Sequence, residues 1–254
     1  MKISKIILYD EPTVPQIQLK KLEKFISETF PIKVETRENF FQDLNESDYK
    51  EIANTRIFDL KKSFQIHNPT VDEINIENQN KDMSNKEEMT LYDGFELLKT
   101  ISRIITTDEK ALHIIFTNKL TCTFDENDFR YHARVLIGSN PVIISTTGAV
   151  EAPAKPKQYY LDLMTDFNKE RIDEIKKKYK GEFLEYDDSR LSEVIEGYLL
   201  QAIMYYETGD AFCEHKKCRL FNAHWQKDLF FSQIENKKLC NKHQKIIKEL
   251  TNQV

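Results

Sequence analysis

Three cysteines and a histidine near the C-terminus have the residue types and the spacing of a metal site. Cys213 and Cys218 are separated by four residues, Cys240 and His243 by two, and 21 residues lie between the pairs. Thiolate sulfur and imidazole nitrogen are ligands that zinc prefers, and two closely spaced ligand pairs are typical of closed tetrahedral sites. We therefore predict one structural zinc ion bound by these four side chains.

Alternatives to this ligand set remain open at the level of sequence. His224 is a plausible fourth ligand in place of His243, whereas His215 is tethered tightly between two cysteines and is a less suitable one. The cysteines could instead be unrelated buried residues, but their spacing favours a shared ion. Cys122 lies in an alternating apolar run, so we interpret it as a small core residue.

A weaker constellation lies in the middle of the chain. His132 alternates with Arg130 and Arg134, so the three side chains can share one face of a strand, with Glu151 or Asp128 as an acidic partner. A histidine, a carboxylate and an arginine could perform acid–base chemistry, which makes His132, Arg134 and Glu151 candidate catalytic residues. A half-buried, ion-paired strand is the simpler interpretation of the same residues.

Composition and charge limit the class of protein. The 254 residues are 40% hydrophobic and carry a net charge of −5, so we expect a folded globular chain. The first residues lack the apolar core of a signal peptide and no run is long enough to cross a membrane, which predicts a cytoplasmic protein with no membrane contact. Four cysteines in that compartment argue against a disulfide scaffold.

The end of the chain differs in charge from the rest. Residues 213–254 hold nine Lys and Arg against four Asp and Glu, so the remainder carries −10. A basic segment next to a metal site could contact nucleic-acid phosphates, although a solvated lysine-rich helix is the simpler interpretation. The lysines concerned are Lys237, Lys238, Lys242, Lys245 and Lys248.

The first part of the chain has the pattern of a β-α-β unit, which implies a parallel strand pair. Residues 3–9 and 32–36 are expected strands, and apolar residues recur at helical spacing between them. Residues 68–89 are almost wholly polar and predict a mobile loop, because they cannot bury enough apolar surface to offset their ordering entropy. An amphipathic helix over 91–105 should follow.

The second part predicts the rest of an α/β core. Residues 112–117, 120–124, 131–137 and 142–146 have strand character and should complete the sheet. Helical periodicity covers 157–178 and 191–206, and Gly209 is a suitable residue to end the last long helix.

The C-terminal segments resemble those of the archaemetzincins, which are zinc-dependent peptidases. The resemblance rests on three segments, which are Gly209-Asp-Ala-Phe-Cys213, Cys218-Arg-Leu220 and Cys240-Asn-Lys-His243. In that family an extended HExxHxxGxxH motif precedes four cysteines that hold a second, structural zinc. Segments such as LYDEP, YHAR, EAPAKP and NAHW extend the similarity to an archaeal group of metallopeptidase-like proteins. The resemblance implies a metzincin-like α/β fold, with a mixed sheet, flanking helices and a C-terminal zinc-binding module.

The sequence departs from this family at the catalytic motif. The matching register places Ala202, Ile203, Tyr206 and Phe212 where the first histidine, the glutamate and the other two histidines should lie. None of these side chains can bind catalytic zinc or act as its general base. We therefore expect a catalytically degenerate metallopeptidase homologue, with an active enzyme using a non-standard site and a nucleic-acid-binding protein as alternatives.

We expect two parts in the chain. Residues 1–212 should form the metzincin-like body, and residues 213–254 should form the zinc module packed on it. The expected role is that of a binding or regulatory scaffold. Its partner would be an extended peptide or a protein that adds to a sheet edge.

Overall fold

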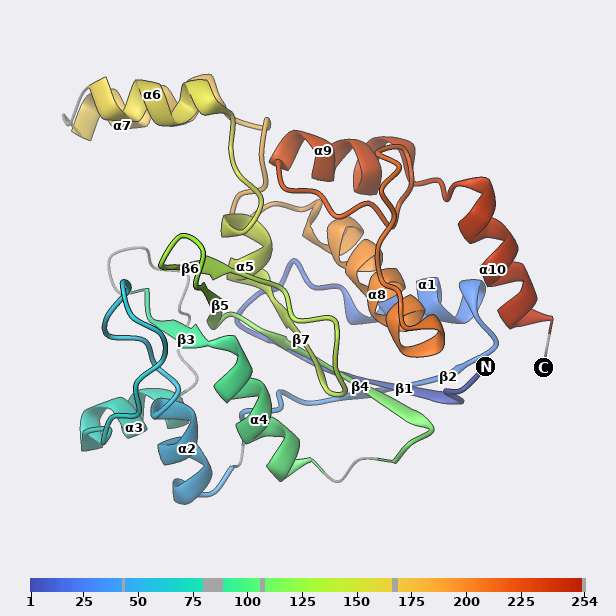
Figure 1. Ribbon diagram of the computed structural model, residues 1–254, viewed down its shortest axis with the longest axis horizontal. Coiled ribbons are helices and arrows are strands. Elements are labelled where there is room, and N and C mark those ends of the chain that lie inside the picture. Colours follow the sequence, from blue (N-terminus) through green and yellow to red (C-terminus); the bar gives the residue numbers. More distant parts are fainter. Residues whose placement is uncertain (43, 80–88, 106–107, 166–168, 253–254) are drawn as a thin grey trace.

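A computed structural model describes residues 1–42, 44–79, 89–105, 108–165 and 169–252. Its centre is a parallel four-stranded sheet in the order β2-β1-β4-β7 (Figure 1). The strands are β1 (Lys5–Tyr9), β2 (Lys33–Arg37), β4 (Ala111–Thr117) and β7 (Val142–Ser145). The expected β-α-β unit is confirmed, because β1 pairs in parallel with β2 across helix α1 (Leu19–Thr29).

A second, three-stranded sheet has the order β3-β5-β6. It comprises β3 (Leu91–Asp93), β5 (Leu120–Asp125) and β6 (Arg130–Ala133). Strand β6 runs antiparallel to β5, with His132 opposite Thr123, and forms one edge of the sheet. The prediction that all central strands complete one sheet is therefore wrong. The chain leaves the first sheet at Asn118 and Lys119, and β5 then pairs with β3 and β6 in the second.

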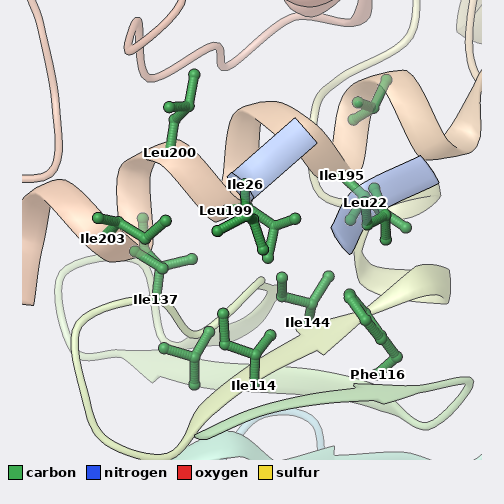
Figure 2. Packing of buried hydrophobic residues seen from close by; sticks show 14 of the residues in the cluster. Leu22, Ile26, Ile114, Phe116, Ile137, Ile144, Ile195, Leu199, Leu200 and Ile203 are labelled. Atoms are coloured by element: carbon green, nitrogen blue, oxygen red, sulfur yellow. The ribbon is translucent and has the colours of Figure 1, made fainter. Parts of the chain in front are cut away.

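Helices cover both faces of the parallel sheet, as an α/β core requires. Helices α1 and α8 (Leu191–Thr208) pack on one face, where Leu22, Ile26, Ile195 and Leu199 meet Ile114 (Figure 2). Helices α2 (Glu46–Ala53) and α4 (Gly94–Ile104) cover the other, around Ile7, Ile115 and Ile143. The expected α/β class with flanking helices is confirmed.

The remaining helices extend from this core. Helix α5 (Thr146–Glu151) follows β7 directly, and α6 (Lys157–Thr165) and α7 (Lys169–Lys178) lie side by side away from the body (Figure 1). The tail contains α9 (Gln226–Phe230), the π-helix η1 (Phe231–Asn236) and α10 (Asn241–Thr251). None of the helices among the described residues is long and apolar enough to cross a bilayer.

Two expectations about polar and apolar segments need correction. Part of the predicted loop over 68–89 is helix α3 (Val71–Gln79), while residues 80–88 lie outside the described residues. The predicted helix over 91–105 begins later, because Leu91 belongs to β3 and Asp93 caps α4 by accepting from the N–H groups of Phe95 and Glu96. Phe95, expected on the apolar face, is 63% exposed.

Candidate metal centre and groove

The structure brings Cys213, Cys218, Cys240 and His243 together, with ligand atoms all within 4.8 Å of one another. The first two flank a short loop closed by Cys213 N–H donating to the Leu220 carbonyl at 2.9 Å. The other two begin helix α10, with Cys240 at its N-cap. Two distant segments of the tail therefore meet at this cluster of sulfur and nitrogen atoms, and beside it Arg219 N–H donates to the Lys238 carbonyl at 2.8 Å.

The distances in the cluster fit a tetrahedral zinc ion. Zinc–sulfur bonds of about 2.3 Å at tetrahedral angles place two sulfurs about 3.8 Å apart. The Sγ atoms of Cys213 and Cys240 are 3.9 Å apart, and Nδ1 of His243 lies 3.6 Å from Sγ of Cys218 and 3.1 Å from Sγ of Cys240. Four protein ligands at these distances would leave no open position for a reacting water.

Burial shapes the protonation of the cluster. It lowers the pKa of His243, with the charge of Lys242 adding to the effect, and this favours the neutral imidazole, which is the form that binds metals. Burial also raises the pKa of Cys218 to about 12. For Cys240 burial acts in the same direction, but the His243 backbone and the thiols of Cys218 and Cys213 outweigh it and hold the pKa below its usual value.

The cluster is fastened to α8 by buried polar contacts. Arg219, next to a ligand cysteine, donates from Nη2 to Glu196 Oε2 at 2.7 Å, and its carbonyl accepts from Gln233 Nε2 at 2.7 Å. Gly197 makes this approach possible, because a Cβ at that position would lie 1.8 Å from Gln233 Oε1. The tail is thereby held against the middle of α8.

The two alternative histidines lie outside the cluster. His215 accepts from the Lys217 N–H within the loop, at 3.2 Å. The His224 side chain is exposed and lines a groove instead, while its carbonyl accepts from Ala154 N–H at 2.8 Å. Trp225 forms a backbone bridge with Ala154 and is 38% exposed.

A groove of about 760 Å³ runs between the second sheet, α8 and the tail. Strand β6 and the segment after it form one wall, and residues 221–224 of the tail form another. All three weak catalytic candidates, His132, Arg134 and Glu151, line it. His224 joins them, and no local pattern around it indicated that it would.

The edge of β6 lines this groove with unpaired backbone groups. Arg134 N–H donates to the Thr121 carbonyl at 2.8 Å, so alternate residues 130, 132 and 134 direct their backbone toward β5. The backbone N–H and C=O groups of Tyr131 and Ala133 consequently point away from β5. Within the described residues they have no hydrogen-bond partner. This edge is open to a further strand.

Helix α8 faces the groove with residues other than those expected from the family register. Ala202 and Ile203 are buried in the core at 1% and 0% exposure, whereas Tyr206 is half-buried and donates to the Glu109 carbonyl. The groove side carries Tyr198, Gln201 and Tyr205, and Phe212 follows the helix there. Sequence reasoning missed these three helix residues.

The candidate acid–base residues do not form a single unit. His132 Nε2 lies 2.9 Å from Asp128 Oδ2, which also accepts from Arg130 at 2.6 Å. Glu151 accepts instead from Tyr186 at 2.8 Å and pairs with Lys155 at 3.5 Å. Arg134 donates to Thr123 Oγ1 at 3.3 Å.

Asp125, Asp128 and His132 form a second group whose ligand atoms lie within 4.8 Å of one another. Of the basic residues of the tail, Lys237 pairs with Glu193 and Lys245 with Glu249.

Fold and site together define an α/β protein with a cysteine–histidine cluster of the kind that binds metal ions. The chain belongs to a probable metallopeptidase family (DUF6775), whose profile matches residues 2–250. Among solved structures, a zinc-dependent peptidase from Methanocorpusculum labreanum (strain Z) is similar at 12% sequence identity, with a TM-score of 0.44 and coverage of 96% of this chain and 99% of that one. No curated protein matches the sequence. The expected metallopeptidase-like family is confirmed, whereas the closer relationship to archaemetzincins stays a prediction.

Proposed function

We propose that this protein is a zinc-stabilised peptide-binding scaffold that has lost the usual catalytic zinc of its family. The Cys213–His243 cluster holds a structural ion, and the groove between β6 and α8 binds an extended peptide. The observation that carries this proposal is the open edge of β6, whose unpaired backbone groups at Tyr131 and Ala133 line the groove. An extended peptide pairing with these groups would add a fourth strand to the second sheet.

The side chains opposite β6 support peptide binding. Gln201 is 3% exposed and donates from Nε2 to the Phe221 carbonyl at 3.3 Å, while its Oε1 has no partner among the described residues. A buried acceptor without a partner is costly unless a ligand or water supplies a donor. A peptide N–H would satisfy it. Tyr205 and Phe212, at 38% and 40% exposure, offer apolar surface to side chains of the same peptide.

The loss of the usual catalytic site follows from residue chemistry. Zinc-assisted hydrolysis requires about three protein ligands, an open position for water and a general base. The groove face of α8 offers two tyrosines and a glutamine. The family register places two buried apolar residues, Ala202 and Ile203, together with Tyr206 and Phe212 at the positions of the motif. Hydrolysis at a non-standard site is the second candidate, favoured by the proximity of Asp125, Asp128 and His132.

Removing one backbone donor of β6 tests peptide binding. Proline is tolerated on an edge strand where its missing N–H would have faced outward, so Ala133→Pro should fold while losing a hydrogen bond to the peptide. The matched control is Ala133→Val, which keeps the N–H. Binding of a fluorescent extended-peptide mixture should fall at least tenfold in the proline variant and persist in the control. Equal binding by both folded variants would refute strand addition at β6.

Cleavage assays separate the scaffold from the second candidate. The peptide mixture is incubated with the protein and added zinc, with and without chelator, and no cleavage above background is expected. Cleavage that disappears with chelator and also in His132→Ala would replace the scaffold by an active enzyme whose site lies on β6. Metal analysis gives the same answer independently: one zinc per chain agrees with the scaffold, and a second zinc lost in His132→Ala contradicts it.

A further inference from the structure

Helix α3 is attached to the body in an unusual way. Of its nine residues only Glu77 is buried, at 1% exposure. Ile74 and Ile76 are half-buried, and neither belongs to a hydrophobic core cluster. Helices of globular proteins are normally held by an apolar face. Here a carboxylate takes the place of that face.

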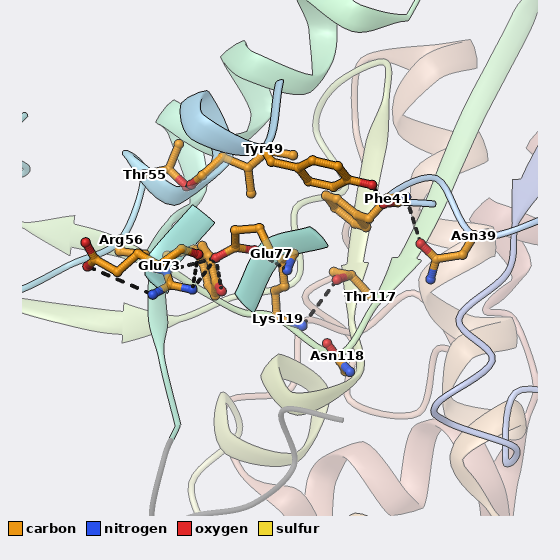
Figure 3. Close-up of polar contacts among 12 residues, drawn as sticks. Asn39, Phe41, Tyr49, Thr55, Arg56, Glu73, Glu77, Thr117, Asn118 and Lys119 are labelled. Carbon is orange, nitrogen blue, oxygen red and sulfur yellow. Dashed lines mark hydrogen bonds and ion pairs between the residues drawn. The ribbon is translucent and has the colours of Figure 1, made fainter. Parts of the chain in front are cut away.

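Three buried side chains of the body converge on the Glu77 carboxylate (Figure 3). Its Oε1 accepts from Arg56 Nε at 2.8 Å, from Arg56 Nη2 at 2.6 Å and from the Tyr92 hydroxyl at 2.8 Å. Its Oε2 accepts from Lys119 Nζ at 2.6 Å. Arg56, Tyr92 and Lys119 are 5%, 0% and 3% exposed. Four donors on one carboxylate form a complete anion-binding site.

The three donor residues belong to the body, and the Glu77 carboxylate comes from α3, whose Glu73 carbonyl also accepts from Arg56 Nη2 at 3.3 Å. Arg56 follows α2, Tyr92 is in β3, and Lys119 lies between the last residue of β4 and the first of β5. The Lys119 ammonium also lies 5.0 Å and 5.1 Å from the ring centroids of Phe41 and Tyr92. In α/β proteins the carboxyl ends of parallel strands are the usual place for ligands. Lys119 occupies such a place.

The Glu77 carboxylate is replaceable, because the attraction and the desolvation of its ion pairs nearly offset each other. Burial alone would raise the pKa of Glu77, but the charges of Lys119 and Arg56 outweigh it and keep the group ionised. Such buried ion pairs contribute little net stability, because their desolvation offsets most of their attraction. Detaching α3 would return all three charges to water. The apolar contacts of α3 are too few to oppose its detachment strongly.

We propose that Arg56, Tyr92 and Lys119 form a carboxylate-binding site that Glu77 occupies within the chain, and that a ligand carboxylate takes its place when α3 detaches. Arg56 also lines a cavity of about 200 Å³ together with residues 57–59, 63–67 and Tyr131. Tyr131 lines the groove as well, so the two cavities share one lining residue of β6.

Emptying the site tests its affinity for carboxylates. Glu77→Ala removes the internal anion, and acetate is the probe, compared with chloride at equal ionic strength and pH. Acetate at ten times its dissociation constant should multiply the folded-to-unfolded ratio about elevenfold and raise the Tm. Wild type and the control Asp72→Ala, which alters an exposed residue of α3, should show no acetate-specific shift. A Glu77→Ala protein that responds equally to acetate and chloride overturns the proposal.

Hydrogen exchange of the wild type keeps the proposal testable if Glu77→Ala does not fold. Amides of α3 should exchange by local opening, faster than those of β4, and acetate should increase their exchange relative to chloride while leaving β4 unchanged. That result would support a site that opens to external carboxylates. Amides of α3 that are as protected as those of β4, with no effect of acetate, would overturn it.

Discussion

Helices α3 and α10 each bury a single residue, and in both it is polar. Helix α3 buries Glu77 among two cations and a tyrosine, and α10 buries His243 among three cysteines. The contacts of Glu77 are complete within the chain. The cysteine–histidine set consists of electron-pair donors of the types that zinc binds, so it could hold one metal ion.

The two helices also differ in apolar support. Ile246, Ile247 and Leu250 of α10 pack against the main core, whereas no residue of α3 belongs to a core cluster. A buried polar group can therefore fasten a helix in two ways. Given the proposed zinc site, the attachment of α10 should respond to chelators. The attachment of α3 depends on charge and should respond to acid and to anions.

The largest effect should come from breaking the metal-dependent attachment. Cys240→Ala removes one ligand, and zinc content is expected to fall from one ion per chain to none, with a loosened tail. Structural zinc contributes on the order of 10 kcal/mol in small zinc-dependent folds, so no other change described below should match it. Metal analysis and limited proteolysis measure the result.

Cys122→Ala is the matched control for this change. Cys122 is buried in β5, away from the cluster, and burial raises its pKa to about 12. Its replacement should leave zinc content unchanged. A Cys240→Ala protein with full zinc and unchanged protease resistance would show that the ligands are assigned wrongly.

Helix α8 is held in place by the burial of apolar side chains. It therefore serves as a reference for α3 and α10, which are fastened by a buried polar group. Restoring the family motif by Ala202→His, Ile203→Glu and Tyr206→His should destabilise the fold, because two of the new side chains enter the core, at about 2 kcal/mol or more for each buried polar group. Denaturant unfolding measures the loss. Tyr205→His, on the groove face, is the control and should change stability far less. Undiminished stability with a second bound zinc would reveal an open site at these positions.

Removing the charge of Lys119 should weaken the attachment of α3 to the body. The loss should be smaller than those expected for the tail and for α8. Lys119→Met keeps the shape of the side chain but leaves Glu77 with Arg56 alone as its cation. Breaking a buried ion pair typically costs about 3–5 kcal/mol, although local detachment of α3 limits the effect on global unfolding. The control is Lys62→Met, which breaks an exposed pair with Asp59 and should cost about 0–1 kcal/mol. Hydrogen exchange should show the difference first at α3, and equal protection in both variants would contradict it.

Local patterns in the sequence predicted the elements and the metal cluster. The β-α-β unit follows from apolar spacing, and the four ligands follow from residue type and pair spacing, both of which are local signals. Glu77 was missed because a polar segment offers no apolar pattern, and its partners lie 15 to 42 residues away. The groove residues of α8 were missed because that helix is buried on most sides. Which face of α8 lines the groove depends on the position of β6 in the fold.

The smallest expected effect is a pH dependence confined to α3. The folded-state pKa of Glu77 lies below its ordinary value of about 4.5, because Lys119 and Arg56 outweigh the burial that would raise it. Its contribution is therefore complete above the unfolded-state pKa and is lost as pH falls through the folded-state value. Protection of α3 amides, corrected for intrinsic exchange, should stay constant from neutral pH to about 5 and decline below.

Glu77→Gln supplies the control for this pH dependence. Its α3 amides should be less protected at neutral pH and should show a weaker decline on acidification, because the titrating carboxyl is absent and Glu73 alone remains beside Arg56. Acid also releases zinc by protonating its ligands, so the comparison must be made on α3 amides and not on global melting. Identical pH profiles of α3 in the wild type and in Glu77→Gln would mean that the charge of Glu77 does not fasten the helix. The distinction between a metal-held and a charge-held helix would then fail at α3.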